Sequence, residues 1–125
     1  MPLGSGQRVL IVDDSPIMRQ MLVKIFSNEG FTVVGEAADG TEAVVKFEEL
    51  KPDLTTLDIV MPKMRGIEVL ERLMAEYPEA KIIMASSVSD ARTVMHCLKM
   101  GAKQYITKPY DEAKIMAAVK KTLGL

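Results

Sequence analysis

The sequence is poor in several features that would commit it to a particular class of protein. It holds one cysteine, Cys97, and no tryptophan. A single cysteine cannot form an internal disulfide, so the disulfide-rich secreted classes are excluded and a reducing, cytoplasmic location is expected. No apolar run is long enough to span a membrane, and the opening residues MPLGSGQ lack the basic and apolar regions of a signal peptide.

An excess of charge of one sign is also missing. The 16 Lys and Arg residues are balanced by 17 Asp and Glu, which gives a net charge of -1. We therefore expect no nucleic-acid binding and no membrane insertion. A hydrophobic share of 48% and a length of 125 residues suit one soluble domain. We assign residues 8–125 to this domain, and residues 1–7, whose Gly-Ser-Gly resembles a cloning remnant, to a flexible N-terminus.

Apolar, β-branched runs alternate along the chain with segments of helical periodicity. The runs occupy residues 8–13, 31–37, 53–58, 81–86 and 104–107. Helical patterns begin at about residue 16, with Ser15 as N-cap, and then cover 41–50, the residues after Gly66, 90–100 and 111–123. Asp39-Gly40 is expected to form a loop turn before the second helix. The alternation predicts an α/β fold, a doubly wound five-stranded parallel sheet covered on both faces by five helices.

Polar residues occupy the carboxyl ends of the predicted strands, where ligands bind in open parallel sheets. The first strand ends in Asp13 and Asp14, the third in Asp58 and the fourth in Ser86, and the fifth leads into Lys108. Adjacent carboxylates repel each other unless a cation lies between them. If the strand order is 2-1-3-4-5, the first and third strands are neighbours, and the three aspartates should converge into an oxygen-rich site suited to Mg²⁺.

These side chains have the chemistry of phosphoryl transfer. With Mg²⁺ bound, about one negative charge remains on the three carboxylates, and Lys108 can offset it. A carboxylate beside a divalent cation, a lysine and a hydroxyl can attack phosphorus and hold the resulting acyl phosphate. The cation and Lys108 would neutralise phosphoryl oxygens, while Ser86 would donate a hydrogen bond to another.

Four motifs in this order resemble the receiver domain of response regulators, closest to its single-domain, CheY-like type. They are VLIVDDS, PDLTTLDIVMPKMRG, IIMASS and GAKQYITKP, and the similarity extends over about residues 8–123. The resemblance implies a flavodoxin-like fold with the strand order 2-1-3-4-5, and a role in two-component, chemotaxis-type signalling. It implies that Asp58 accepts a phosphoryl group from a histidine kinase. Beyond Mg²⁺-dependent self-phosphorylation and self-dephosphorylation, it implies no enzymatic activity.

The same resemblance implies roles for the other strand-end residues. Asp14 would bind Mg²⁺ directly, with Asp13 nearby or acting through water, and Asp58 and the backbone carbonyl of Val60 would complete the metal site. Lys108 and Ser86 would bind the phosphoryl group. Ser86 and Tyr105 would form a switch pair.

The family pattern also predicts partners and an assembly state. A histidine kinase would act as phosphodonor, and a downstream protein would bind the face formed by the fourth helix, the fifth strand and the fifth helix. A phosphatase is a further expected partner. The protein itself is expected to be a monomer.

Three positions distinguish this chain within the resemblance. The family usually has Asp or Asn before the glycine at position 66, and this chain has Arg65, which changes the local turn and the charge near the site. Val60 and Val88, two residues beyond Asp58 and Ser86, lie in the family beside the path of the water that hydrolyses the acyl phosphate. Both are apolar and cannot orient that water, so we expect slow self-dephosphorylation.

Simpler interpretations of the same residues stay open at this point. Asp13 and Asp14 could cap the following helix, Ser86 could merely end a strand, and Tyr105 could hold its hydroxyl in water. As whole-protein alternatives, the chain could be a phosphatase with an aspartyl nucleophile, a flavodoxin-type electron carrier, or a receiver domain excised from a larger regulator. The phosphatases usually place a second acid two residues after the nucleophile, where this chain has Val60. The sequence DDSPIM would repel a flavin phosphate.

Overall fold

The computed structural model describes residues 4–125, in which five strands alternate with five helices. The elements are β1 (Arg8–Val12), α1 (Pro16–Asn28), β2 (Thr32–Ala37), α2 (Gly40–Leu50), β3 (Leu54–Leu57), α3 (Gly66–Glu76), β4 (Ile82–Ser86), α4 (Ala91–Met100), β5 (Gln104–Thr107) and α5 (Glu112–Leu123). Residues 1–3, part of the predicted flexible N-terminus, lie outside the described residues. The next residues form a turn, in which the Gly4 amide donates to the Glu29 carbonyl (2.8 Å).

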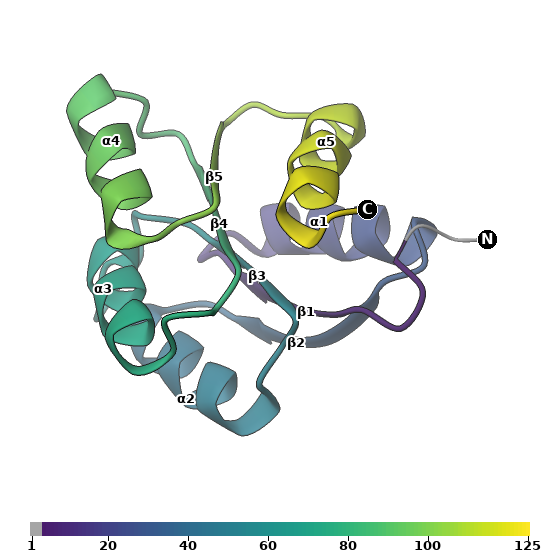
Figure 1. Ribbon diagram of the computed structural model, residues 1–125, viewed down its shortest axis with the longest axis horizontal. Helices are drawn as coiled ribbons and strands as arrows, with labels where there is room; N and C mark the ends of the chain where they lie inside the picture. The colour runs from purple at the N-terminus through teal and green to yellow at the C-terminus, as the bar shows by residue number, and fades with distance from the viewer. Residues whose placement is uncertain (1–3) are drawn as a thin grey trace.

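The strands form one parallel sheet in the order β2-β1-β3-β4-β5, as predicted. Helices α1 and α5 cover one face, and α2, α3 and α4 cover the other (Figure 1). β1 and β3 therefore lie in the middle of the sheet, while β5 forms an edge. Within residues 4–125, no helix has both the length and the apolar character needed to cross a membrane.

Each face of the sheet has its own hydrophobic core. Along β1, Val9 and Ile11 pack toward α1 and α5, whereas Leu10 and Val12 pack toward the other three helices. This alternation follows from the two-residue period of a strand. Because both faces are covered, the β1 side chains Val9 to Val12 are buried, which explains why the sequence shows an unbroken apolar run there.

Four of the five helices begin with a side-chain cap that accepts a hydrogen bond from the first turn. The capping residues are Ser15 for α1, Asp39 for α2, Asp90 for α4 and Asp111 for α5. Such caps satisfy amide groups that have no partner inside the helix. The prediction of a loop at Asp39-Gly40 was wrong at its second residue, because the Asp39 cap lets α2 begin at Gly40. Helix α3 begins after Arg65, which forms no side-chain cap.

The strand register brings the predicted site residues to one edge of the sheet. Val12 lies beside Leu57, and Leu57 lies beside Met84. The residues that follow β1 and β3 are Asp13 and Asp58, so both leave the sheet at the same level. This edge carries the candidate site.

Candidate metal and phosphoryl site

Lys108 bridges two buried aspartates. Its Nζ atom lies 2.8 Å from Oδ2 of Asp13 and 2.9 Å from Oδ2 of Asp58. Asp13 is 1% exposed and Asp58 is 5% exposed. Burial alone would lower the pKa of Lys108, but the hydrogen bonds and charges of the two aspartates outweigh this penalty and raise the pKa above its ordinary value. Lys108 is therefore a charged group held between two carboxylates.

Asp13 has a partner for each of its polar groups. Its amide donates to the Ala37 carbonyl (3.0 Å), and its Oδ1 accepts from the Ser15 amide (2.9 Å). Its own carbonyl accepts a hydrogen bond from the Arg19 guanidinium. Asp13 does not cap α1, whose N-cap is Ser15, so the capping interpretation was wrong for this residue. Its Oδ1 holds the turn before the helix, and its Oδ2 belongs to the acidic site.

Asp58 is held by the backbone around it. Its amide donates to the Val12 carbonyl (3.0 Å), and its Oδ1 accepts from the Ile59 amide (2.7 Å). Gly66 packs directly against it, because a Cβ atom at position 66 would lie 1.9 Å from the Asp58 carbonyl oxygen. The Gly66 amide also donates to the Ile59 carbonyl (2.8 Å). A glycine is required where two backbone segments approach this closely.

Asp14 completes the acidic cluster from the solvent side. One carboxylate oxygen from each of Asp13, Asp14 and Asp58 can be chosen so that all three lie within 4.8 Å of one another. Asp14 is exposed, and within residues 4–125 its carboxylate has no hydrogen bond or ion pair. Three carboxylates beside one lysine leave an excess of negative charge, and carboxylate oxygens are the ligands that Mg²⁺ prefers. The residues present therefore fit Mg²⁺.

The loop after β3 carries an exposed apolar side chain two residues beyond Asp58. Val60 is 54% exposed. Lys63 adopts a left-handed backbone conformation (φ 67°) in the same loop, and its Nζ lies 3.4 Å from Oδ2 of Asp39. Gly40 lets the loop approach α2, since a Cβ atom there would lie 2.0 Å from the Met64 carbonyl oxygen. The loop is thus fixed against the start of α2.

Ser86 and Tyr105 are linked through the backbone of Val88. Ser86 is fully buried, and its hydroxyl oxygen accepts a hydrogen bond from the Val88 amide (3.2 Å). The Tyr105 hydroxyl donates to the Val88 carbonyl, so it is not held by water as the simpler interpretation supposed. Burial is the main cause that raises the pKa of Tyr105, which keeps its hydroxyl protonated as a donor.

Sequence reasoning missed two contributors to the site. Arg19 has the pattern of an ordinary helix-surface residue, and only the fold shows that it reaches back to Asp13. Gly66 was noted as part of a motif, but its close approach to Asp58 depends on how the loop after β3 returns. The glycine itself was the one signal that could have suggested such an approach.

Comparison with known proteins identifies a consistent set of relatives. The sequence profile of the response regulator receiver domain matches residues 9–120. The chemotaxis protein CheY of Thermotoga maritima is 46% identical over 116 residues, which cover 93% of this chain and 97% of that protein. The crystal structure of a CheX-CheY-BeF3-Mg complex from Borrelia burgdorferi superimposes with a TM-score of 0.93 at 42% identity, covering 95% of this chain and 90% of that one.

A similar domain also occurs within a longer protein. A protein-glutamate methylesterase/protein-glutamine glutaminase of Bacillus licheniformis is 46% identical over 111 residues, which cover 86% of this chain but 31% of that protein.

Proposed function

The chain belongs to the response regulator receiver domain family, of the CheY type that acts in two-component signalling, and we propose that Asp58 is its phosphoacceptor. The donor is the phosphohistidine of a histidine kinase. The observation that carries this proposal is the position of Lys108, whose ammonium contacts Asp58 and Asp13 at once. A cation fixed at that point can stabilise the negative charge as it moves from the carboxylate to the phosphoryl oxygens of the acyl phosphate.

The proposed reaction transfers one group between two residues. A carboxylate oxygen of Asp58 attacks phosphorus, the bond between phosphorus and the imidazole nitrogen breaks, and the nitrogen keeps its electron pair. Asp13, Asp14, Asp58 and the Val60 carbonyl would hold Mg²⁺, which when bound neutralises charge on the phosphoryl oxygens. The Ile59 amide, which donates to Oδ1, and Gly66, which packs on the carbonyl, keep the Asp58 side chain oriented.

The signal is proposed to leave the site through Val88. A phosphoryl group adds about -1.5 to -2 charges and new acceptor oxygens, which attract the Ser86 hydroxyl. When Ser86 turns toward them, the Val88 amide loses its acceptor and the backbone around Val88 is free to move. The Val88 carbonyl holds the Tyr105 hydroxyl, so that movement repositions Tyr105. Tyr105 then fills the space that Ser86 leaves.

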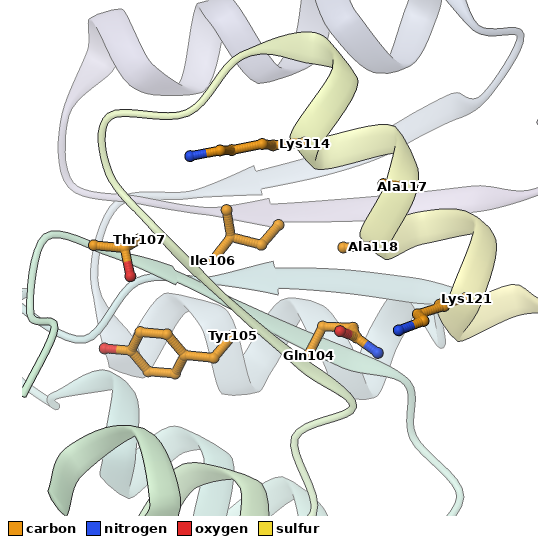
Figure 2. A pocket seen from close by; sticks show the side chains of 8 residues that line it. All are labelled: Gln104, Tyr105, Ile106, Thr107, Lys114, Ala117, Ala118 and Lys121. Carbon is orange, nitrogen blue, oxygen red and sulfur yellow. The ribbon is translucent and has the colours of Figure 1, made fainter. Parts of the chain in front are cut away.

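The partner face is proposed to be formed by α4, β5 and α5. A groove of about 460 Å³ lies along this face between the edge strand β5 and α5 (Figure 2). It is lined by Gln104, Tyr105, Ile106, Thr107, Lys114, Ala117, Ala118 and Lys121. Tyr105 belongs both to this lining and to the link with Val88, which supports a connection between phosphorylation and binding. The two lysines favour a downstream protein with acidic groups at its contact surface.

The phosphoacceptor is tested by mass spectrometry after incubation with acetyl phosphate and Mg²⁺. Wild type should gain the mass of one phosphoryl group, with peptide mapping to Asp58. Asp58→Asn keeps the shape and removes the nucleophile, so it should gain none. Asp53→Asn is the matched control, since Asp53 is an exposed carboxylate at the opposite end of β3. Full phosphorylation of Asp58→Asn would contradict the proposal.

The switch and the face are tested by binding. With BeF3⁻ as a stable stand-in for the phosphoryl group, a candidate partner such as a CheX-like protein or a kinase domain should bind wild type more tightly than Ser86→Ala. Equal binding would mean that the coupling does not run through Ser86. Turnover of an added phosphomonoester would instead favour the phosphatase alternative, and the proposal is that no such turnover occurs.

A further inference from the structure

Arg19 joins three parts of the chain that meet beside the acidic cluster. It lies in the first turn of α1, and its side chain is 18% exposed. Its Nη1 atom donates to the Asp13 carbonyl oxygen (2.5 Å). Its Nε atom lies 3.4 Å from Oε1 of Glu36, on the neighbouring strand β2. The guanidinium therefore holds the end of β1 against both α1 and β2.

The Asp13 carbonyl belongs to the peptide group that leads into Asp14. Fixing that carbonyl fixes the plane of the peptide bond, and with it the positions of the Asp14 nitrogen and Cα atoms from which the side chain leaves the backbone. Asp14 has no other restraint on its carboxylate within residues 4–125, whereas Asp13 and Asp58 are each held by Lys108. The contact with Arg19 is thus the side-chain contact that acts on the orientation of Asp14.

Charge alone does not explain this contact. The positive charge of Arg19 is already offset by Glu36, so little of it remains for the three aspartates. What the guanidinium supplies is geometry, because a planar group can donate in two fixed directions at once and a lysine cannot. The backbone of Glu36 is held in turn by Lys46, whose ammonium donates to the Glu36 carbonyl.

We propose that Arg19 is a positioning residue that orients Asp14 for a divalent cation by holding the Asp13–Asp14 peptide group. This inference rests on the proposed metal site. It makes a specific prediction about ion selectivity. Mg²⁺ demands nearly ideal octahedral geometry, whereas Ca²⁺ accepts flexible coordination, so a misdirected Asp14 impairs Mg²⁺ binding more than Ca²⁺ binding. Loss of the positive charge alone would instead strengthen the binding of both ions, because it removes a cation from beside the three carboxylates.

The experiment is calorimetric titration of the whole chain with Mg²⁺ and, separately, with Ca²⁺. Arg19→Met should weaken Mg²⁺ binding about tenfold, the usual scale for residues that orient metal ligands, and Ca²⁺ binding much less. Arg19→Lys keeps the charge without the planar group and should behave like Arg19→Met. Lys24→Met removes the same charge from an exposed position on the same helix and should bind both ions as wild type does.

The outcomes separate this inference from the metal site on which it rests. If wild type binds no Mg²⁺, the proposed metal site is wrong and the role of Arg19 falls with it. If wild type binds Mg²⁺ and both Arg19 variants bind Mg²⁺ as tightly as wild type does, the metal site stands and the inference about Arg19 is overturned. Equal losses for the two ions would also overturn it, because they would show a general disturbance of the site. Stronger binding of both ions by Arg19→Met, reversed in Arg19→Lys, would overturn it in favour of a charge effect. Should Arg19→Met fail to fold in circular dichroism, Arg19→Lys decides, with a selective loss of Mg²⁺ binding expected.

Discussion

The turn after β1 (residues 13–15) and the loop after β3 (residues 58–65) each deliver an aspartate to the same site, but they are held by different means. Side chains hold the turn: the Ser15 hydroxyl caps α1, and Arg19 donates to Asp13. The loop is held mainly by close packing of backbone against backbone, which is possible because Gly66 and Gly40 have no side chain. Beyond the contacts of Asp58 itself, the Lys63–Asp39 ion pair tethers the loop, with its lysine exposed.

This difference predicts different responses to substitution. Removing one hydrogen bond from the turn leaves the others in place and costs about 1 kcal/mol. Adding a methyl group to the loop forces backbone atoms apart, and backbone cannot turn away as a side chain can. The turn should therefore tolerate change better than the loop.

The largest effect is expected for Gly66→Ala. The new Cβ atom would meet the Asp58 carbonyl oxygen at 1.9 Å, and we expect the free energy of unfolding to fall by about 3 kcal/mol in urea denaturation. Gly35→Ala is the control, because its Cβ atom would meet Leu50 Cδ1, the movable end of a side chain, at 2.7 Å. Equal losses in the two variants would contradict the view that backbone contact makes the loop intolerant.

The next effect concerns the lysine that joins the two regions. Lys108→Met leaves two buried carboxylates without their cation and should lower the free energy of unfolding by about 2 kcal/mol in the absence of Mg²⁺. Mg²⁺ should restore more stability to the variant than to wild type. A loss that Mg²⁺ does not reduce would show that Lys108 acts by packing.

The same lysine makes the free energy of unfolding depend on pH, with a sign that follows from its pKa shift. The pKa of Lys108 is raised in the folded protein. The contribution of Lys108 to the free energy of unfolding is therefore fully present below the ordinary lysine pKa of about 10.4, and it is lost as the pH rises through the raised pKa. The difference between wild type and Lys108→Met should therefore stay constant from about pH 7 to 9 and narrow only above about pH 10.4. Urea denaturation across that range measures it.

A kinetic effect is expected from the exposed valine of the loop. Val60→Asn places a polar group near Asp58 that can orient water. We therefore expect the acyl phosphate to hydrolyse about tenfold faster, which corresponds to an activation free energy lower by about 1.4 kcal/mol. Phosphate release should be timed after the donor is removed, with Val45→Asn as a control at an exposed valine on α2. If wild type already decays within seconds and Val60→Asn decays no faster, crowding by Val60 does not set the lifetime.

The smallest effect is a gain in stability. Arg65→Asn gives α3 the side-chain cap that the other four helices have, and we expect the free energy of unfolding to rise by about 1 kcal/mol. Ser15→Ala removes the α1 cap from the turn and should lower it by about the same amount. If Arg65→Asn brings no gain while Ser15→Ala brings the expected loss, the start of α3 is held by the loop alone.

The turn and the loop also differ in how far sequence could predict them. Strand periodicity was enough to predict a parallel sheet, whose strands end at one edge, and the motifs of the receiver family supplied its strand order. Together they predicted the convergence of Asp13, Asp14, Asp58 and Lys108. Contacts that depend on the reach of a side chain, such as Arg19 to Asp13, leave no periodic trace. The approach of Gly66 to Asp58 depends on the path of the returning loop, and residue types alone do not encode that path.

The link through Val88 gives one residue two independent spectroscopic reporters. Its amide group bonds to Ser86 and its carbonyl group to Tyr105, and these belong to different peptide units. A ¹⁵N label on Val88 therefore reads the serine, while a ¹³C label on its carbonyl carbon reads the tyrosine. As BeF3⁻ is added, resonances that move together indicate a concerted change. Resonances that move one after the other give the order of events from a single labelled position.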